Sequence, residues 1–104
     1  MKKKLKSFYL TFFIFLGLCL PANSDKKFKL GKEVFLKNCA SCHVLGGAVS
    51  VSNAGPNLNR IRPKMKRVIN AVTMGIGVMP AYEDILSIQE IKNVSYYVSK
   101  STKK

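Results

Sequence analysis

Cys39 and Cys42 are separated by two residues, and His43 follows the second cysteine directly. Two thiols at this spacing with an adjacent imidazole form the pattern C-x-x-C-H, through which haem c is attached to a polypeptide. The thiols would add to the two vinyl groups of the haem, and His43 would lie beneath the iron as its proximal ligand. The sequence therefore predicts one haem c, held covalently by two thioethers and ligated by His43.

The iron of such a haem has a second axial position, and methionines are the main candidates to fill it. His43 is the only histidine in the chain. Met65 and Met74 fall on an expected helix, where a methionine more often packs than binds a metal. Met79 falls in an expected loop beside Pro80, where its thioether can be directed at a metal. We expect Met79 to be the second ligand, with Met74 as the next candidate.

Ligation by one histidine and one methionine would leave no axial position for a substrate or for oxygen. A soft thioether stabilises ferrous iron, and apolar surroundings disfavour the added charge of the ferric state, so both raise the reduction potential. The iron can then change its oxidation state with little movement of its ligands. The residues therefore predict a one-electron carrier and not an enzyme.

The tetrapeptide Gly55-Pro56-Asn57-Leu58 lies in a region, 44–61, that is rich in Gly, Ser and Asn and is expected to be a loop. A ligating histidine normally donates its other ring N–H to a carbonyl group, which fixes the plane of the ring. We expect the Pro56 carbonyl group to be that acceptor. We also expect Leu58 to pack against the face of the haem.

Three helices are expected around this centre. The first covers 27–39, the second begins with Pro63 and stops at Gly75, and the third runs to about residue 100. The third has the clearest start, because Ser87-Ile88-Gln89-Glu90 is a capping box. No alternating pattern typical of strands is present. The predicted fold is therefore all-α, with helices and loops wrapped around the haem.

The first and third helices are expected to pack against each other. Gly31 lies in the middle of the first helix, where a glycine is costly, and this suggests a close approach of another helix. Phe35 would then meet Tyr97 or Val94 across the contact.

The first 24 residues have the features of an export signal. Four lysines precede an almost wholly apolar run over 8–20, and Ala22-Asn23-Ser24 supplies small residues before a cleavage site. As a helix, that run would reach only about 20 Å, short of the roughly 30 Å core of a bilayer. We expect residues 1–24 to be cleaved and 25–104 to form one domain with no stable membrane span. Its expected location is the bacterial periplasm, or a thylakoid lumen or equivalent.

The chain is strongly basic, with 18 Lys and Arg residues against 5 Asp and Glu residues. Without the four lysines of the signal, 14 cations still face 5 acids, a formal charge of +9. A basic protein can bind nucleic acid, but the export signal argues against this partner and no motif supports it. We expect a monomer whose partners are redox proteins with an acidic docking face, with an anionic membrane surface as the alternative.

Three motifs in order carry a resemblance to a known family, namely Cys39-Ala40-Ser41-Cys42-His43, Gly55-Pro56-Asn57-Leu58 and Met79-Pro80. With them, the chain resembles the small class I cytochromes c over residues 27–100. The resemblance implies a helical fold around haem c, a periplasmic or intermembrane location and one-electron transfer between larger redox complexes. The run 68–81 also looks like small bacterial cytochromes associated with sulfite dehydrogenases, and somewhat like photosynthetic soluble cytochromes.

Parts of the pattern are also consistent with other functions. A cytochrome subunit bound permanently to a dehydrogenase, such as sulfite dehydrogenase, would expose apolar surface at the haem edge, whereas a mobile carrier would expose lysines there. A ligand-binding or peroxidatic haem protein would require that Met79 does not bind iron. A thiol–disulfide protein would use Cys39 and Cys42, normally on a βαβ fold. Structural zinc would need a fourth ligand beside the two thiolates and His43.

Overall fold

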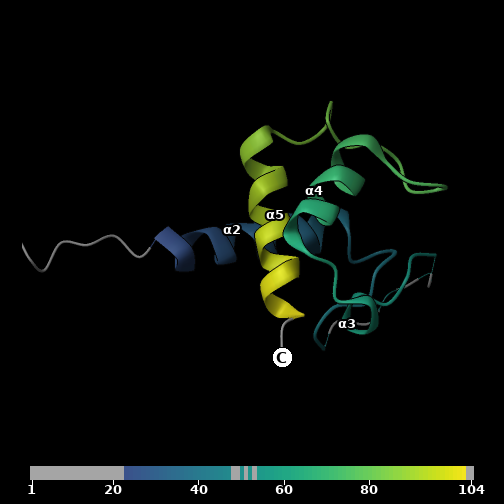
Figure 1. The fold of residues 1–104 in the computed structure, drawn as a ribbon, viewed down its shortest axis with the longest axis horizontal. Coiled ribbons are helices and arrows are strands. Elements are labelled where there is room, and N and C mark those ends of the chain that lie inside the picture. Colours follow the sequence, from purple (N-terminus) through teal and green to yellow (C-terminus); the bar gives the residue numbers. More distant parts are fainter. Residues whose placement is uncertain (1–22, 48–49, 51, 53, 103–104) are drawn as a thin grey trace, which may run out of the picture.

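The computed structural model describes residues 23–47, 50, 52 and 54–102 of the chain. Four α-helices follow one another in this part, and Figure 1 shows no strand among them. The helices are α2 (Asn23–Asn38), α3 (Leu58–Ile61), α4 (Met65–Met74) and α5 (Ile88–Ser101). The prediction of an all-α fold is confirmed. No helix in the described part of the chain is long and apolar enough to cross a membrane.

The expected export signal lies almost entirely outside the described residues. Residues 1–22 are not described, and Asn23 and Ser24 are the first two residues of α2. Cleavage after Ser24 would therefore remove the first two residues of this helix.

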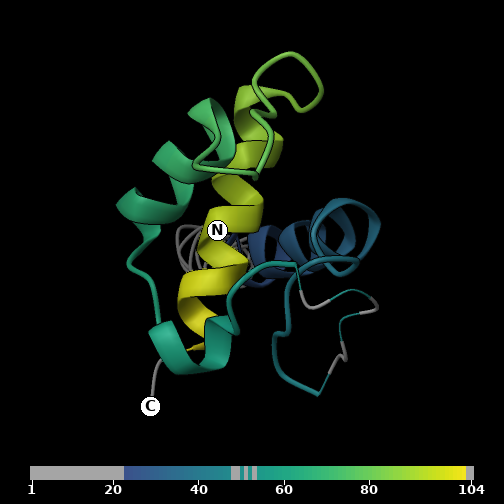
Figure 2. The ribbon, with the colours of Figure 1, turned by 90° about the vertical axis from the view of Figure 1, so that its right-hand side faces the viewer.

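α5 packs against both α2 and α4, and Figure 2 shows α2 crossing behind α5. At the crossing, a Cβ on Gly31 would lie 2.7 Å from the Cβ of Tyr97 and 2.6 Å from the carbonyl carbon of Asn93. The Tyr97 ring meets that of Phe35 at 5.7 Å and that of Phe28 at 4.9 Å between centroids. The predicted contact of the first and third helices, with glycine at its closest point, is confirmed.

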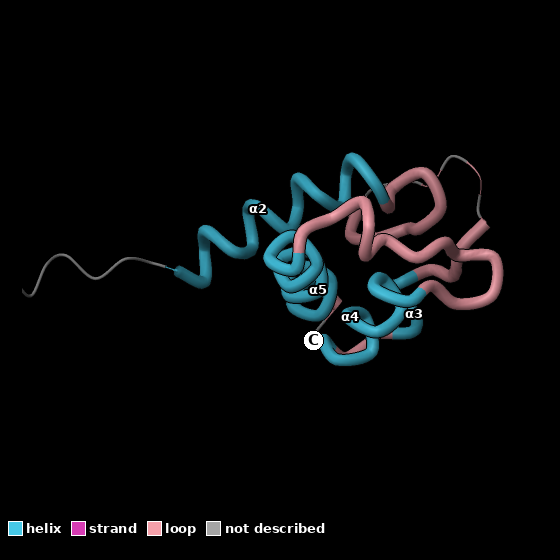
Figure 3. Tube along the Cα trace, turned by 90° about the horizontal axis from the view of Figure 1, so that it is seen from above, coloured by secondary structure: helices cyan, strands magenta, loops and turns pink. Residues whose placement is uncertain are grey.

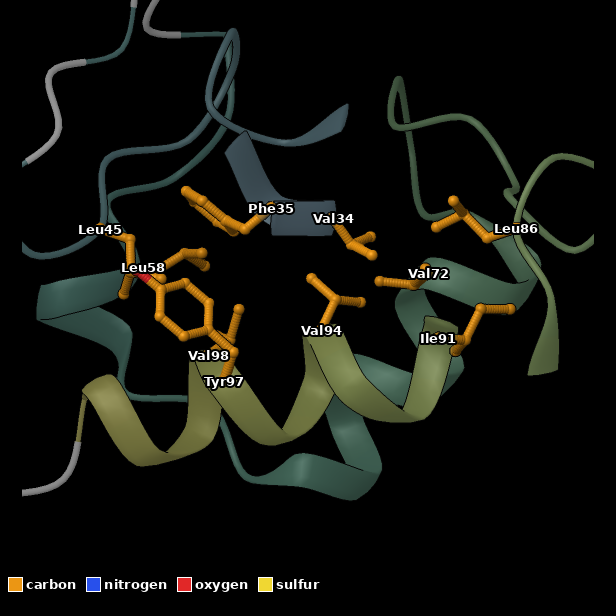
Figure 4. Packing of buried hydrophobic residues seen from close by; sticks show 10 residues of the cluster. All are labelled: Val34, Phe35, Leu45, Leu58, Val72, Leu86, Ile91, Val94, Tyr97 and Val98. Atoms are coloured by element: carbon orange, nitrogen blue, oxygen red, sulfur yellow. The ribbon is translucent and has the colours of Figure 1, made fainter. Parts of the chain in front are cut away.

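The core lies between α5, the end of α2 and α4, as Figure 4 shows. Phe35 and Val94 are almost completely buried, with 1% and 0% of their surface exposed. The remaining buried apolar residues are Val34, Leu45, Leu58, Val72, Leu86, Ile91, Tyr97 and Val98. This core holds α2 and α5 together, while the loops gather to one side of the helices (Figure 3).

Two of the expected helix ends are confirmed. The Ser87 hydroxyl accepts a hydrogen bond from the Glu90 N–H at 3.1 Å, and the Glu90 carboxylate accepts one from the Ser87 N–H at 2.8 Å, so the capping box is complete. α4 ends before Gly75, which has a positive φ of 73° and donates its N–H to the carbonyl group of Ala71. Glycine adopts this conformation without the steric cost of a side chain.

The other expected boundaries differ from the structure. α2 begins four residues before the expected start at 27, and its first eight residues are exposed. α4 begins at Met65, not at Pro63, because Lys64 is extended (ψ 152°) and forms the N-cap. The expected loop 44–61 contains the short helix α3, which starts because the Asn57 side chain accepts a hydrogen bond from the Asn59 N–H at 2.9 Å.

Candidate haem site

The segment from Cys39 to His43 continues the last turn of α2. The Cys39 N–H donates to the carbonyl group of Phe35 at 2.8 Å, and the N–H groups of Cys42 and His43 both donate to the Cys39 carbonyl group, at 3.1 and 2.9 Å. Both cysteines are free thiols and are partly exposed. The turn thus carries the two thiols and the imidazole to the wall of one cavity.

This cavity has a volume of about 270 Å³ and lies between the end of α2, α4, α5 and the loops. Its lining includes Cys39, Cys42, His43 and Met79, and most of its other side chains are apolar. The apolar and small residues of the lining are Phe35, Ala54, Gly55, Pro56, Leu58, Ile61, Pro63, Val68, Ala71, Val72, Ile76, Val78, Pro80, Val94 and Val98. Two thiols, an imidazole and a thioether around one apolar space are the groups that a covalently held haem needs.

The His43 ring is fixed by the segment that begins at Gly55. Its Nδ1 lies 2.9 Å from the Pro56 carbonyl oxygen, in hydrogen-bond contact. The Gly55 N–H donates to the Cys42 carbonyl group at 2.9 Å. Leu58 is buried, lines the same cavity and donates its N–H to the Val44 carbonyl group at 3.0 Å. The contacts of Pro56 and Leu58 with the haem itself stay a prediction.

Met79 is presented to the cavity by a two-residue turn. The Ile76 N–H donates to the Met79 carbonyl group at 3.1 Å, and the Met79 N–H donates to the Ile76 carbonyl group at 3.0 Å. Gly77 occupies the first central position with φ +57°, whereas Val78 has no positive φ, as in a type II′ turn. A Cβ on Gly75 would lie 2.6 Å from the Met79 carbonyl oxygen, so the turn folds tightly against the end of α4.

The two other methionine candidates lie elsewhere. Met74 is 72% exposed and lines a neighbouring groove along α4, not the cavity. Met65 lies in the first turn of α4 and is also absent from the described lining of the cavity. The placement therefore favours Met79 as the second axial ligand.

Tyr82 is a residue of the site that the sequence patterns do not mark. Its ring lines the cavity, and its hydroxyl donates a hydrogen bond to the Asn38 carbonyl group at 3.2 Å. Burial, and then the nearby Cys39 and Cys42, raise the pKa of Tyr82. Its position three residues after Met79 is the one signal that could have drawn attention to it.

Cys39 does not have the electrostatic environment of a reactive cysteine in a thiol–disulfide catalyst. Burial, and then the neighbouring Cys42, raise the pKa of Cys39 from 9.0 to about 11. Reactive cysteines of C-x-x-C motifs have lowered pKa values, because the thiolate is the nucleophile. In the described residues, moreover, no three His, Cys, Asp or Glu side chains converge as ligands of a metal ion, as structural zinc would require.

The surface beside the cavity is basic and partly apolar. Residues 34–82 contain six cations and no acidic residue. Five of these cations form what we call the basic edge, a run of exposed side chains over α3 and the start of α4, namely Arg60, Arg62, Lys64, Lys66 and Arg67. Arg67 lines both the cavity and the groove along α4. Two apolar residues of the cavity lining are also exposed, Ile76 by 62% and Val78 by 93%, and Ile76 lines the groove along α4 together with Arg67.

The chain is similar to known c-type cytochromes. The family model described as cytochrome C oxidase, cbb3-type, subunit III matches residues 26–98. A cytochrome c6-like protein of Nostoc sp. is 34% identical over 111 residues, which cover all of this chain and 97% of that protein. The structure of the c-type cytochrome SorU from Sinorhizobium meliloti is similar with a TM-score of 0.69 and 46% identity, over 75% of this chain and 93% of SorU.

A second solved structure, cytochrome c6C from Synechococcus sp., is similar with a TM-score of 0.57 and 36% identity, over 70% of this chain and 95% of that one. These proteins share the all-α cytochrome fold, and proteins of the cytochrome c6 type are electron carriers and not enzymes. The chain belongs to the small mono-haem class I cytochromes c, the electron carriers that hold haem c covalently through a C-x-x-C-H motif.

Proposed function

We propose that this protein is an exported one-electron carrier in which His43 and Met79 are the axial ligands of the haem. The observation that carries the proposal is that both side chains line the same apolar cavity as the thiols of Cys39 and Cys42. One cavity thus holds the two attachment points and both ligands. The bound haem supplies the reversible exchange of one electron between ferric and ferrous iron.

The hydrogen bond to Pro56 determines what the His43 ring can do. A carbonyl oxygen only accepts, so the bond requires that Nδ1 carries the proton. The other nitrogen, Nε2, then has a free lone pair for the metal. The carbonyl group also fixes the plane of the ring and increases the basicity of the ligand.

The turn at Met79 would keep the second ligand in place while the charge of the iron changes. The turn is closed by the two hydrogen bonds between Ile76 and Met79. Because these two bonds fix the backbone at Ile76 and at Met79, a change of charge at the metal need not move the thioether. Small ligand movement favours fast exchange of an electron through an exposed edge of the haem.

The basic edge supports partners with an acidic docking face. Arg67 lines the cavity, Lys64 and Lys66 line the groove beside it, and no acidic residue occurs between positions 34 and 82. Opposite charges on two proteins accelerate their encounter and orient them. We propose that redox proteins dock here, that the carrier is a monomer after removal of residues 1–24, and that it acts in the bacterial periplasm or an equivalent compartment.

A second candidate is a cytochrome subunit bound permanently to a dehydrogenase such as sulfite dehydrogenase. The observation that favours it is the exposure of Ile76 and Val78 beside the cavity, at 62% and 93%. Exposed apolar patches mark stable interfaces more often than transient ones. Copurification with a dehydrogenase through a high-salt wash would support this candidate over the mobile carrier.

The proposal is tested by visible spectra of the exported protein in both oxidation states, before and after extraction with acid–acetone. We expect the colour to stay with the polypeptide and the oxidised protein to show the weak near-red band of thioether-bound ferric haem. A covalent haem without this band would contradict the role of Met79. A colourless exported protein would contradict the haem site as a whole.

A further inference from the structure

Tyr82 joins three parts of the fold through its polar groups. Its N–H donates to the carbonyl group of Val72 in α4 at 2.8 Å. Its carbonyl group accepts the N–H groups of Ile85 and Leu86, at 3.0 and 2.8 Å, just before α5. Its hydroxyl donates to the carbonyl group of Asn38, the last residue of α2, at 3.2 Å.

The Tyr82 hydroxyl bonds to the end of α2, directly before the first cysteine of the haem site. The carbonyl groups of the last helical turn have no partner within their helix, and Tyr82 supplies one for Asn38. Asn38 directly precedes Cys39, the first attachment point, and its own side chain donates to the Val34 carbonyl group at 3.0 Å. Tyr82 also follows Met79 by three residues. The bond therefore links the loop that carries Met79 to the segment that carries the thiols.

We infer that Tyr82 is a positioning residue that holds the Met79 thioether in place relative to the Cys39 attachment. This inference rests on the proposed role of Met79 as a ligand. The two hydrogen bonds between Ile76 and Met79 fix the turn internally, but they do not fix it to α2. The Tyr82 hydroxyl supplies that connection across the cavity, so its loss gives the turn more freedom to move away from the metal.

The experiment is a titration of the ferric holoprotein with imidazole, which competes with the thioether for the iron. The variant is Tyr82→Phe, which removes only the hydroxyl and keeps the ring in the cavity lining. The control is Tyr96→Phe on α5, because the Tyr96 ring faces the Nζ of Lys100 and lies outside the cavity lining. A hydrogen bond of ordinary net strength predicts about 2- to 10-fold tighter binding of imidazole to Tyr82→Phe. We expect Tyr96→Phe to match the wild type.

The near-red band of the wild-type protein separates a failure of the Tyr82 inference from a failure of the Met79 assignment. If the band is present and Tyr82→Phe binds imidazole as the wild type does, the role of Tyr82 is overturned while Met79 stands. If the wild type has no such band, the assignment of Met79 fails and the role of Tyr82 fails with it. A urea titration of the ferrous proteins is measured alongside, and a loss of stability in Tyr82→Phe with unchanged imidazole affinity would also overturn the inference.

Discussion

Gly55 lies against the ring of His43, so closely that a Cβ at this position would be 2.5 Å from Cε1 and 2.6 Å from Nδ1 of the ring. The same Cβ would lie 2.9 Å from the Cys42 carbonyl oxygen. The orientation of the imidazole thus depends on the absence of a side chain one residue before the carbonyl group that accepts its hydrogen bond.

We expect Gly55→Ala to displace the imidazole and weaken its bond to Pro56. The misfit should cost about 1–3 kcal/mol of unfolding free energy, as overpacking does, and should shift the reduction potential. Urea unfolding and redox titration of the holoprotein measure both effects. Gly47→Ala is the matched control, because a Cβ there meets nothing within 4 Å. Equal behaviour of the two variants would show that the ring has room to adjust.

We expect Met79→Leu to abolish the near-red band of the ferric protein and to leave the iron high-spin, because leucine fills a similar volume but has no sulfur to donate. Met74→Leu, at an exposed position outside the cavity lining, should leave the band unchanged. Visible spectra of the two oxidised variants show which methionine gives rise to the band. Loss of the band in the Met74 variant alone would reverse the assignment.

The ligand pattern was the most predictable part of the site. C-x-x-C-H fixes the two thiols and the imidazole on one hydrogen-bonded turn, so their joint placement follows from local sequence alone. The Pro56 acceptor and the loop at Met79 were also predictable, because proline restricts the backbone and glycine permits the positive φ of a tight turn. Their meeting at one cavity agrees with those expectations.

Other features depend on contacts between distant segments and leave no local signal. Tyr82 reaches Asn38, which is 44 residues away, and a tyrosine after a loop has no distinctive pattern. Pro63 was expected to start a helix, but Arg62 takes a left-handed conformation (φ 43°) at the end of α3 and Lys64 is extended. The helix α3 was not predicted, because its four residues are too few to show a periodic pattern.

We expect Gly31→Ala to destabilise the fold by about 1–3 kcal/mol or more, because the new methyl group meets the backbone of Asn93. In an isolated helix the same change would stabilise by about 0.5–1 kcal/mol, so the sign identifies the tertiary contact. Lys32→Ala, at the exposed neighbouring position, should change stability by less than about 0.5 kcal/mol. Urea unfolding of the holoproteins shows whether Gly31→Ala lowers or raises the free energy of unfolding.

We expect the oxidation of the ferrous protein by hexacyanoferrate(III), an anion, to slow as salt rises, because salt screens the basic edge. Replacing Lys64 and Lys66 together by Glu should lower the rate several-fold at about 0.02 M ionic strength and much less at about 0.5 M. Stopped-flow kinetics measure the oxidation rate of both proteins at the two ionic strengths.

In the control variant, Lys92 and Lys100 on α5 are replaced by Glu instead, which changes the net charge by the same amount. Each lies two residues from a cavity-lining valine, Val94 or Val98, and so points to the opposite side of the helix. Equal effects of the two double variants would show that net charge, and not the basic edge, governs the encounter.

The crossing of α2 and α5 has a consequence for how the chain is made. Gly31 and Asn93 are 62 positions apart in the sequence, and α5 follows the other three helices of the described residues. Contacts between residues so far apart in the sequence form slowly, because closing the loop between them costs conformational entropy. The contact between α2 and α5 therefore cannot form on a chain that has been translated only as far as α4.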